Sequence, residues 1–443
     1  MAARSQPRSN VGTPPGGRHT SKPPVRVSIL IDVLGSGRWW DALAGILDRS
    51  HISTAAGLPG LVDDAMAPLG LGAEMYLVDL AQEVLRPIRG GAGPTLDVDG
   101  SVAGRAFRLG RVTPGSEAPE RTPTLWVPLL DGTERLGVLR VALPPGTEPD
   151  DQELQERCWL LAGFIGHLVV SKRSYGDALH EVQRSKPLSV SSELLWQLLP
   201  PLTFATEQLV VSAVLEPYER IGGDGFDYAV DLSHAFFAIY DAVGHDIQAG
   251  LTAALTLAAT RNSRREGKTD LVEMGRSADD VVAREAPDRR FVTAVLARLE
   301  IATGRLQYLN AGHPAPLLLR ANKTVKALDT AHRVPLGVLG SAPGLELGTE
   351  QLEPGDRLLL YTDGIVEARD RDGQEFGVDR LIDLAERSSA GGLPAPEMLR
   401  RLSHRVREHQ AGQLADDATL LLVEWSSTGH QRLLPHPTTL RRS

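Results

Sequence analysis

The chain has 443 residues, of which 42% are hydrophobic and 23% charged. This length exceeds what one hydrophobic core usually supports, so we expect two or more domains. The ordinary composition excludes wholesale disorder and a coiled-coil rod. A formal net charge of −9 argues against a protein that coats nucleic acid electrostatically, and we expect no nucleic-acid partner.

The single cysteine, Cys158, excludes an intramolecular disulfide and any zinc site built from several cysteines. The longest apolar stretches, such as Leu251–Ala259, are much shorter than the roughly 20 residues that span a bilayer. The apolar run Val27–Leu34 is short and contains Asp32, so it makes a poor signal peptide. These features predict a cytoplasmic protein without a membrane span.

Two terminal segments, 1–25 and 426–443, lack apolar periodicity and are expected to be disordered tails. In residues 26–170, apolar residues recur at helical spacing up to about Gly70, and strand-like apolar runs follow. This order predicts a small α+β domain. The strands expected there are Glu74–Asp79, Thr124–Leu129 and Arg135–Leu143.

Helical spacing returns from Gln152 to about Leu199 and ends at Pro200, so we assign residues 171–202 to a helical connector. Residues 203–425 then alternate strands joined by hairpins with inserted helices, which predicts a second, largely antiparallel α+β domain. One helix begins near Ile247, with an apolar face expected at Ile247, Leu251, Ala254, Leu255 and Ala258. The strands expected in this domain are Leu209–Leu215, Ala235–Tyr240, Phe291–Glu300, Arg305–Asn310, Leu317–Arg320, Arg357–Tyr361 and Thr419–Glu424.

Four acidic clusters lie at the ends of strands in the second domain. They are Gly222-Gly223-Asp224-Gly225-Phe226-Asp227, Asp241-Ala242-Val243-Gly244-His245-Asp246, Thr362-Asp363-Gly364 and Asp416-Asp417-Ala418-Thr419. Each alone is typical of a turn. Together they let several carboxylates converge on one end of a sheet, which is tolerated mainly when cations lie between them. Oxygen ligands without cysteine favour magnesium or manganese.

These clusters and several further motifs occur in the order seen in bacterial PPM-type serine/threonine protein phosphatases. The second domain resembles the sporulation stage II E-like group over roughly residues 205–425. The N-terminal domain resembles a GAF-type sensor through its helix and strand order. The resemblance implies an α-β-β-α sandwich with largely antiparallel sheets. The further motifs are Phe291-Val292-Thr293, Asn310-Ala311-Gly312-His313, Pro335-Leu336-Gly337, Pro354-Gly355-Asp356 and Glu375-Phe376-Gly377.

The resemblance also implies roles for single residues. Asp241 matches the aspartate that bridges two divalent ions, Mn²⁺ or Mg²⁺. The backbone carbonyl of Ala242 matches a further metal ligand beside it, and together they form one corner of the metal site. Asp224 matches a ligand of the first ion, and Asp363 and Asp416 match ligands of the second. A water shared by the ions then attacks the phosphorus directly, without a covalent enzyme intermediate.

The sequence allows both a functional and a structural interpretation for two aspartates, Asp227 and Asp417, and for two histidines, His245 and His313. Asp227 and Asp417 either hold metal-bound waters or are turn residues. His245 is either a general acid for the leaving oxygen or ties two loops together. For His313 we favour a structural role in a turn between strands. No arginine is assigned to the substrate phosphate, although Arg220 lies close to the first motif.

The sequence therefore predicts a metal-dependent phosphoprotein phosphatase whose sensor domain acts through the connector. The resemblance implies a phosphorylated anti-sigma factor antagonist as substrate, with a small-molecule or protein input at the sensor. The connector suggests a homodimer. Two alternatives are a catalytically silent module that binds the same partner and a hydrolase of small phosphoesters; the silent module is disfavoured because Asp224, Asp241, Asp363 and Asp416 are all present.

Overall fold

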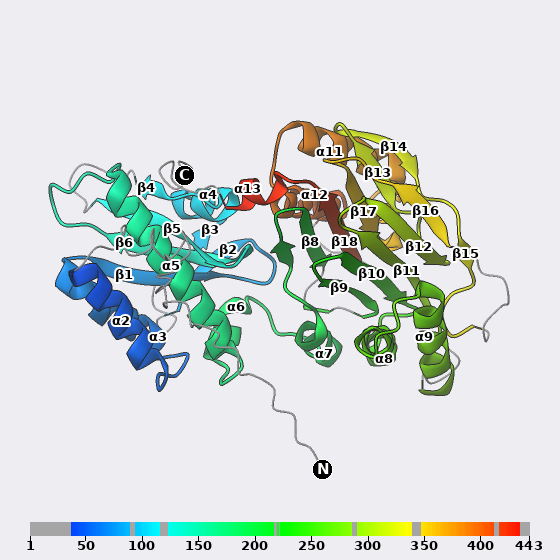
Figure 1. Ribbon diagram of the computed structural model, residues 1–443, viewed down its shortest axis with the longest axis horizontal. Coiled ribbons are helices and arrows are strands. Elements are labelled where there is room, and N and C mark those ends of the chain that lie inside the picture. Colours follow the sequence, from blue (N-terminus) through cyan, green and yellow to red (C-terminus); the bar gives the residue numbers. More distant parts are fainter. Residues whose placement is uncertain are drawn as a thin grey trace, which may run out of the picture.

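The computed structural model describes residues 37–88, 94–115, 123–216, 219–220, 222–285, 290–338, 347–411 and 416–434. It contains an N-terminal and a C-terminal body side by side, each mixing helices with a mainly antiparallel sheet (Figure 1). The tail predicted for residues 1–25 lies outside the described residues. In the described ranges, no helix combines the length and apolar character needed to cross a membrane.

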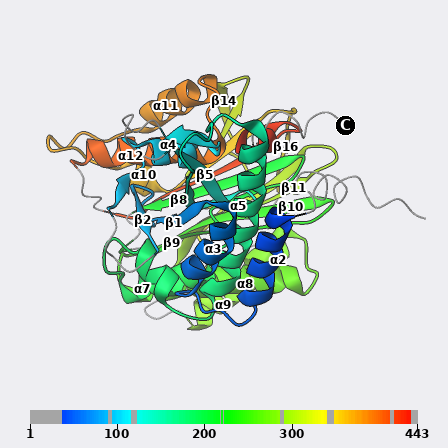
Figure 2. The ribbon, with the colours of Figure 1, turned by 90° about the vertical axis from the view of Figure 1, so that its left-hand side faces the viewer.

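The N-terminal domain is built on a sheet with strand order β3-β2-β1-β6-β5-β4. Helix α5 (Gln152–Arg173) crosses one face next to α2 (Arg38–Ser50) and α3 (Leu58–Met66), as Figure 2 shows. Helix α4 (Val102–Leu109) covers the opposite face. This agrees with the predicted α+β domain, and its assignment to the GAF type stays a prediction. The strands are β1 Gly72–Val78, β2 Val84–Pro87, β3 Leu96–Asp97, β4 Thr113–Gly115, β5 Thr124–Asp131 and β6 Glu134–Ala142.

The only cysteine of the chain, Cys158, lies on α5 in the core between this helix and the sheet. Its side chain is fully buried, and burial raises the pKa of its thiol to about 12. A buried thiol of this kind behaves as a small apolar group.

The segment from Gln152 to Leu199 does not continue as uninterrupted helix. Helix α5 ends at Arg173, and two short helices follow, α6 (Ala178–Gln183) and α7 (Val190–Leu198). The chain after α6 is fixed to the N-terminal sheet, because the carbonyl of Gln183 accepts from the N–H of Leu80 (3.0 Å) and the Ser185 hydroxyl donates to Asp79 (2.7 Å). These contacts replace the next turns of helix.

The C-terminal domain contains two stacked sheets. One has strand order β15-β12-β11-β10-β9, with β16 also paired to β12, and the other has order β14-β13-β17-β18-β8-β7. The strands are β7 Thr203–Ala205, β8 Leu209–Glu216, β9 Asp224–Val230, β10 His234–Ala242, β11 Val292–Glu300, β12 Arg305–Ala311, β13 Leu317–Arg320, β14 Lys323–Ala327, β15 His332–Arg333, β16 Gly348–Gln351, β17 Arg357–Tyr361 and β18 Ala418–Trp425.

Helices cover the outer face of each sheet. Helices α8 (Ile247–Arg265) and α9 (Leu271–Glu285) pack on the first sheet, and α11 (Val378–Ala390) and α12 (Ala395–His409) pack on the second (Figure 1). Apolar side chains of both sheets meet in the space between them. The layers therefore follow the predicted α-β-β-α order.

The apolar face expected on α8 is wrong at Ile247, Leu251 and Ala258, which are all exposed. Ile247 and Leu251 are 55% and 41% exposed, whereas the buried face is formed by small residues such as Ala249 and Ala253. Three buried threonines, Thr252, Thr256 and Thr260, satisfy their hydroxyls on carbonyls of the preceding turn. Small side chains allow the helix to approach the sheet closely, and Leu257 is the large apolar residue that this face also buries.

Part of the segment expected to be a disordered C-terminal tail is folded. Residues Gly429–Leu433 form helix α13, which packs on β8 with Leu433 buried. Trp425 at the end of β18 also donates its indole N–H to the carbonyl of Ile301 (2.9 Å). Apolar and hydrogen-bonded anchors thus extend the folded domain past residue 425, and the remaining predicted tail, 435–443, lies outside the described residues.

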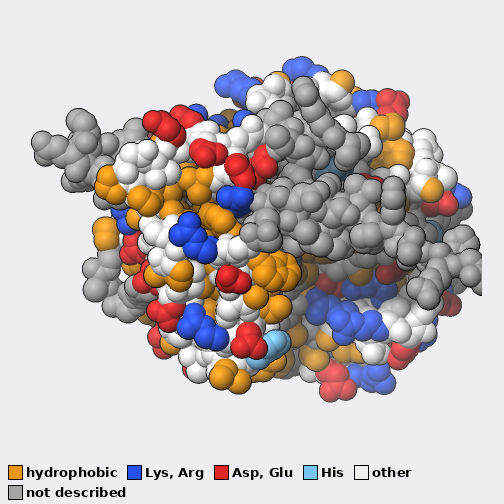
Figure 3. All heavy atoms as spheres, turned by 60° about the vertical axis from the view of Figure 1, so that its left-hand side comes forward, with side chains coloured by type: hydrophobic (Ala, Val, Ile, Leu, Met, Phe, Trp, Pro, Cys, Tyr) orange, Lys and Arg blue, Asp and Glu red, His pale blue; other side chains and the backbone are white. Residues whose placement is uncertain are grey.

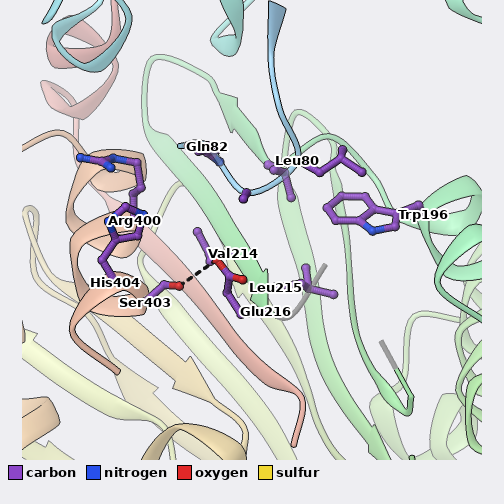
Figure 4. A pocket seen from close by; sticks show the side chains of 11 residues that line it. Leu80, Gln82, Trp196, Val214, Leu215, Glu216, Arg400, Ser403 and His404 are labelled. Carbon is purple, nitrogen blue, oxygen red and sulfur yellow. Dashed lines mark hydrogen bonds between the residues drawn. The ribbon is translucent and has the colours of Figure 1, made fainter. Parts of the chain in front are cut away.

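The two domains meet at α12. Arg400 on this helix donates two hydrogen bonds to Asp99 of the N-terminal domain (2.6 and 3.0 Å). Beside it is a cavity of about 10 Å³, roughly the space of one water, lined by the loop Leu80–Gln82, Trp196, β8 and α12 (Figure 4). Glu216 points into it and accepts from Ser403 (3.3 Å). Polar contacts and apolar side chains such as Leu80, Trp196 and Val214 therefore lie together at this part of the interface.

Large apolar side chains are exposed on the N-terminal domain, among them Trp40, Leu47, Ile52 and Tyr175. Figure 3 turns this domain forward and shows apolar side chains gathered on its surface. A homodimer through the connector stays a prediction.

Candidate active site: carboxylates between the two sheets

Asp224 and Asp241 lie opposite each other at the ends of two paired strands. They are Cα partners in the antiparallel pairing of β9 with β10. Asp224 is buried and faces the second sheet, because its Oδ2 accepts from the hydroxyls of Thr362 and Thr419, each at 2.7 Å. Thr362 follows β17 and Thr419 lies in β18, so one carboxylate is held by both sheets.

Asp363 and Asp416 come from the second sheet. Asp363 begins the short helix α10 (Asp363–Val366), directly after β17. A Cβ on Gly364 would lie 1.8 Å from the carbonyl oxygen of Asp417, so only glycine allows α10 and the start of β18 to approach this closely. The carboxyl groups of Asp241 and Asp363 are close enough to share a hydrogen bond, which connects the two halves of the cluster.

Asp417 holds the glycine turn of the first motif. Its Oδ2 accepts from the backbone N–H groups of Gly222 (2.6 Å), Gly223 (2.7 Å) and Asp224 (3.3 Å). Three such bonds from a turn resemble the way backbone N–H groups surround an anion. The carboxylate therefore fixes the backbone that carries Asp224.

The cluster is electrostatically unfavourable as it stands. Burial, and next the charge of Asp241, raise the pKa of Asp224 well above its usual range. Burial and the charges of Asp363 and Asp416 raise the pKa of Asp241 to about 7. Burial raises the pKa of Asp417 to about 6 against its three backbone hydrogen bonds. The largest charge effects on Asp224 and Asp241 all come from carboxylates, which is the environment that a bound cation relieves.

The donor chemistry fits Mg²⁺ or Mn²⁺, since every charged group in the cluster offers hard oxygen atoms. In the part of the chain that the structure describes, however, no three His, Cys, Asp or Glu side chains already surround a common metal position. The carboxylates converge without forming a closed ligand set, and bound ions would have to draw them together.

The motifs from Asp241 to Thr419 lie in a stretch of sequence that matches a known family. Residues 233–426 match the sequence model of the family described as Stage II sporulation protein E (SpoIIE). The C-terminal domain is SpoIIE-like. This match supports the resemblance of the domain to PPM-type phosphatases.

Among curated proteins, the chain is similar to two phosphoserine phosphatases of Bacillus subtilis. It is 26% identical to RsbU over 230 residues, which cover 49% of this chain and 63% of RsbU. It is 25% identical to RsbP over 222 residues, which cover 49% of this chain and 53% of RsbP. Protein IcfG of Synechocystis is 23% identical over 278 residues, 56% of this chain and 42% of IcfG. The chain thus spans about half the length of the curated relatives it matches.

Two solved structures are also similar to the SpoIIE-like domain. The SiaA-PP2C domain of Pseudomonas aeruginosa is 19% identical, with 53% of this chain and 94% of that chain covered and a TM-score of 0.45. The PP2C phosphatase domain of Bacillus subtilis SpoIIE, solved with a fragment of its regulatory domain, is 20% identical, with 50% and 65% covered and a TM-score of 0.41.

Asp227 of the SpoIIE-like domain lies away from the cluster. It is three residues after Asp224 on the same strand, so its side chain faces the opposite side of the sheet. There it is paired with Arg261 (2.5 Å) and Arg264 (2.8 Å) of α8. The sequence suggested either a residue that holds metal-bound water or a turn residue, and neither describes this contact. The carboxylate of Asp227 instead anchors α8 to the sheet.

The two histidines occupy different environments. His313 is buried, its Nδ1 is 2.9 Å from the Thr293 hydroxyl, and burial lowers its pKa to about 3, which keeps the ring neutral and agrees with a structural role. His245 is exposed beside the cluster, and its backbone packs on Gly222. Within the described residues, no side-chain hydrogen bond ties His245 to a second loop. Arg220 is exposed near the first motif.

The sequence reasoning missed the two threonines that hold Asp224. Both lie inside the acidic motifs: Thr362 directly precedes Asp363, and Thr419 is three residues after Asp416. The alternation of side chains along β18 could have identified Thr419. It places Thr419 on the same face as Leu421 and Val423, which face the core.

Proposed function

We propose that the SpoIIE-like domain hydrolyses phosphoserine and phosphothreonine in a protein substrate, using two divalent ions, Mn²⁺ or Mg²⁺. The observation that carries this proposal is the convergence of Asp224, Asp241, Asp363 and Asp416 from four separate motifs at one end of the sandwich. The similarity to two phosphoserine phosphatases supports the reaction class.

In this proposal some residues would bind the ions, and others hold the ligand residues in place. Asp224, Asp241, Asp363 and Asp416 would hold the two ions, and the backbone carbonyl of Ala242 would add a further oxygen ligand beside Asp241. Thr362 and Thr419 fix the carboxylate of Asp224. Bound ions would neutralise phosphate charge and lower the pKa of a bound water from 15.7 toward about 7.

Other residues of the domain have supporting parts in the proposed reaction. Asp417 keeps the glycine turn in place through its three backbone hydrogen bonds. His245 is exposed beside the cluster and remains the candidate general acid for the serine or threonine oxygen that leaves.

We further propose that the substrate is a phosphorylated anti-sigma factor antagonist and that the N-terminal domain is a GAF-type sensor that regulates the reaction. The names of RsbU and RsbP as phosphoserine phosphatases are consistent with a phosphoprotein substrate. The contact between Arg400 and Asp99 gives the N-terminal domain a direct connection to the SpoIIE-like domain.

The proposal is tested by following hydrolysis of p-nitrophenyl phosphate and of a phosphoserine protein with Mn²⁺, with a chelator, and with Asp241→Asn. We expect metal-dependent turnover that the variant loses. Asp231→Asn, at the exposed hairpin between β9 and β10, is the matched control and should retain turnover. If a folded protein shows no turnover with either metal, the silent binding module becomes the better interpretation. Turnover of small esters without any turnover of phosphoprotein would instead favour the small-molecule hydrolase.

A further inference from the structure

The turn Val243–Asp246 connects the end of β10, which carries Asp241 and Ala242, to the start of α8. On one side it packs directly on the glycine turn of the first motif. The N–H of Ala242 donates to the carbonyl of Gly223 (3.0 Å), and a Cβ on Gly223 would lie 2.3 Å from the Ala242 oxygen. A Cβ on Gly222 would likewise lie 2.5 Å from the Cα of His245, so backbone meets backbone on this side of the turn.

On its other side the turn is held by one side chain, Arg290. Its Nη1 donates to the carbonyl of Val243 (2.8 Å) and its Nη2 donates to the carboxylate of Asp246 (2.7 Å). The arginine side chain is only 17% exposed. Gly244 has φ +99°, and a Cβ there would lie 2.8 Å from Nη1, so the guanidinium fills the space that a side chain would take. The planar fork of arginine suits this two-point contact better than lysine does.

Asp246 extends the same contact to the helix. Its second oxygen accepts from the N–H of Ala249 (2.9 Å), which makes it the N-cap of α8. One carboxylate thus joins Arg290, the turn and the first turn of the helix.

The neighbouring peptide unit shows why this matters for the site. The N–H of Val243 donates to the carbonyl of Phe291 (3.1 Å), the residue after Arg290. In a planar trans peptide, the carbonyl of Ala242 must point the opposite way from that N–H. The direction of the Ala242 carbonyl is therefore set by contacts to the Arg290–Phe291 segment.

We propose that Arg290 is a positioning residue that holds the Val243–Asp246 turn and thereby orients the metal corner formed by Asp241 and the carbonyl of Ala242. This inference rests on the proposed function for its metal-binding part. Arg290 does not touch the substrate or the ions; it acts through the backbone of the turn.

The test compares Arg290→Gln and Asp246→Asn with the control Arg320→Gln in the full chain. Arg320 also contacts carboxylates, Asp356 (2.7 Å) and Glu353 (2.8 Å), and the carbonyl of Gln351 (3.3 Å), but at the opposite end of β17 from Asp363. Asparagine at position 246 retains the capacity to cap α8 and removes only the ion pair. Circular dichroism and thermal unfolding check that each variant folds.

Two readouts are measured. Amide hydrogen exchange of residues 243–250 in the metal-free protein reports the turn, and calorimetric titration with Mn²⁺ reports the metal corner. For Arg290→Gln we expect faster exchange in this segment and Mn²⁺ affinity weaker by about tenfold or more, as is typical when a residue supporting a ligand is lost. Asp246→Asn should have a smaller effect in the same direction, and Arg320→Gln should change neither readout.

Unchanged exchange in Arg290→Gln would overturn the inference, because the turn would then not depend on the arginine. Faster exchange with unchanged Mn²⁺ affinity would overturn its connection to the metal corner. If the unaltered protein binds no Mn²⁺, the proposed function fails together with the metal-binding part, while the exchange data still decide whether Arg290 holds the turn.

Discussion

At the domain interface Glu397 is fully buried among arginines, whereas in the active site Asp224 is buried among other carboxylates. Glu397 accepts from Arg400 (2.8 and 3.1 Å) and from Arg401 (2.9 Å). Arg108 and Arg135 of the N-terminal domain lie 3.9 Å away. Burial alone would raise the pKa of Glu397, but the hydrogen bonds and charge of Arg400 outweigh it and lower the pKa.

The two regions bury the same chemical group and differ in where the compensating charge comes from. At the interface the chain supplies the cations itself, so the charges there hold α12 against the N-terminal domain. In the active site the largest charge effects are repulsive, and the pKa values of Asp224, Asp241 and Asp417 are raised. A carboxylate compensated within the chain contributes to the fold, whereas uncompensated carboxylates form the kind of environment that a bound cation would stabilise.

The largest expected effect is at the interface. Glu397→Gln leaves several buried arginines without their shared carboxylate, and we expect a loss of about 3–5 kcal/mol in the free energy of unfolding, typical of breaking a buried ion pair. Denaturant unfolding of the full chain measures it. The control is Glu353→Gln, which removes an exposed partner of Arg320 and should cost less than about 1 kcal/mol. A loss as small for Glu397 as for Glu353 would contradict the role assigned to this network.

The opposite sign is expected in the active site. Asp241→Asn removes one of several repelling charges, so at pH 8, above the pKa of about 7, the metal-free protein should gain about 1–2 kcal/mol of unfolding free energy. Thermal or denaturant unfolding in chelator measures the gain. Added Mn²⁺ should stabilise the unaltered protein more than the variant. A variant that is less stable than the unaltered protein in chelator would refute the view that this cluster lacks compensation.

A smaller effect concerns pH. Glu134, the first residue of β6, accepts from the backbone N–H of Thr203, and burial raises its pKa to about 7. Since the folded protein retains this proton while the unfolded chain releases it near pH 4.5, the contribution of Glu134 to stability falls between pH 4.5 and 7 and is lost above that range.

Glu134→Gln, which stays neutral, should therefore flatten the fall in stability between pH 5 and pH 8 by about 1–2 kcal/mol, because partial solvent contact reduces the full effect. Unfolding free energies of both proteins across this pH range provide the measurement. Parallel curves would show that Glu134 is ionised in the folded state at pH 5.

Local patterns were sufficient to predict much of the SpoIIE-like domain. The expected strands match the observed ones to within a few residues, because apolar alternation and turn glycines are local signals. The convergence of Asp224, Asp241 and Asp363 followed from their positions at strand ends. The position of Asp227 could also have been read from alternation, since residues three apart on a strand face opposite sides.

Contacts between distant parts of the chain could not be predicted in this way. Arg400 and Asp99 are 301 residues apart, and Arg290 and Asp246 are 44 apart, so neither pair leaves a local pattern. The buried face of α8 was mistaken because hydropathy favours Ile247 and Leu251, whereas close packing on a sheet favours alanine and threonine. The division of the connector into α6 and α7 depended on hydrogen bonds to the N-terminal sheet.

The burial of Cys158 has a practical consequence for spectroscopy. With a pKa of about 12 and no solvent contact, this thiol presents almost no thiolate to a maleimide or nitroxide reagent near neutral pH. The native chain therefore already serves as an unreactive background, and cysteines introduced at exposed positions of each domain should label selectively. Distances between paired labels would then report whether the N-terminal domain moves relative to α12 without first removing the natural cysteine.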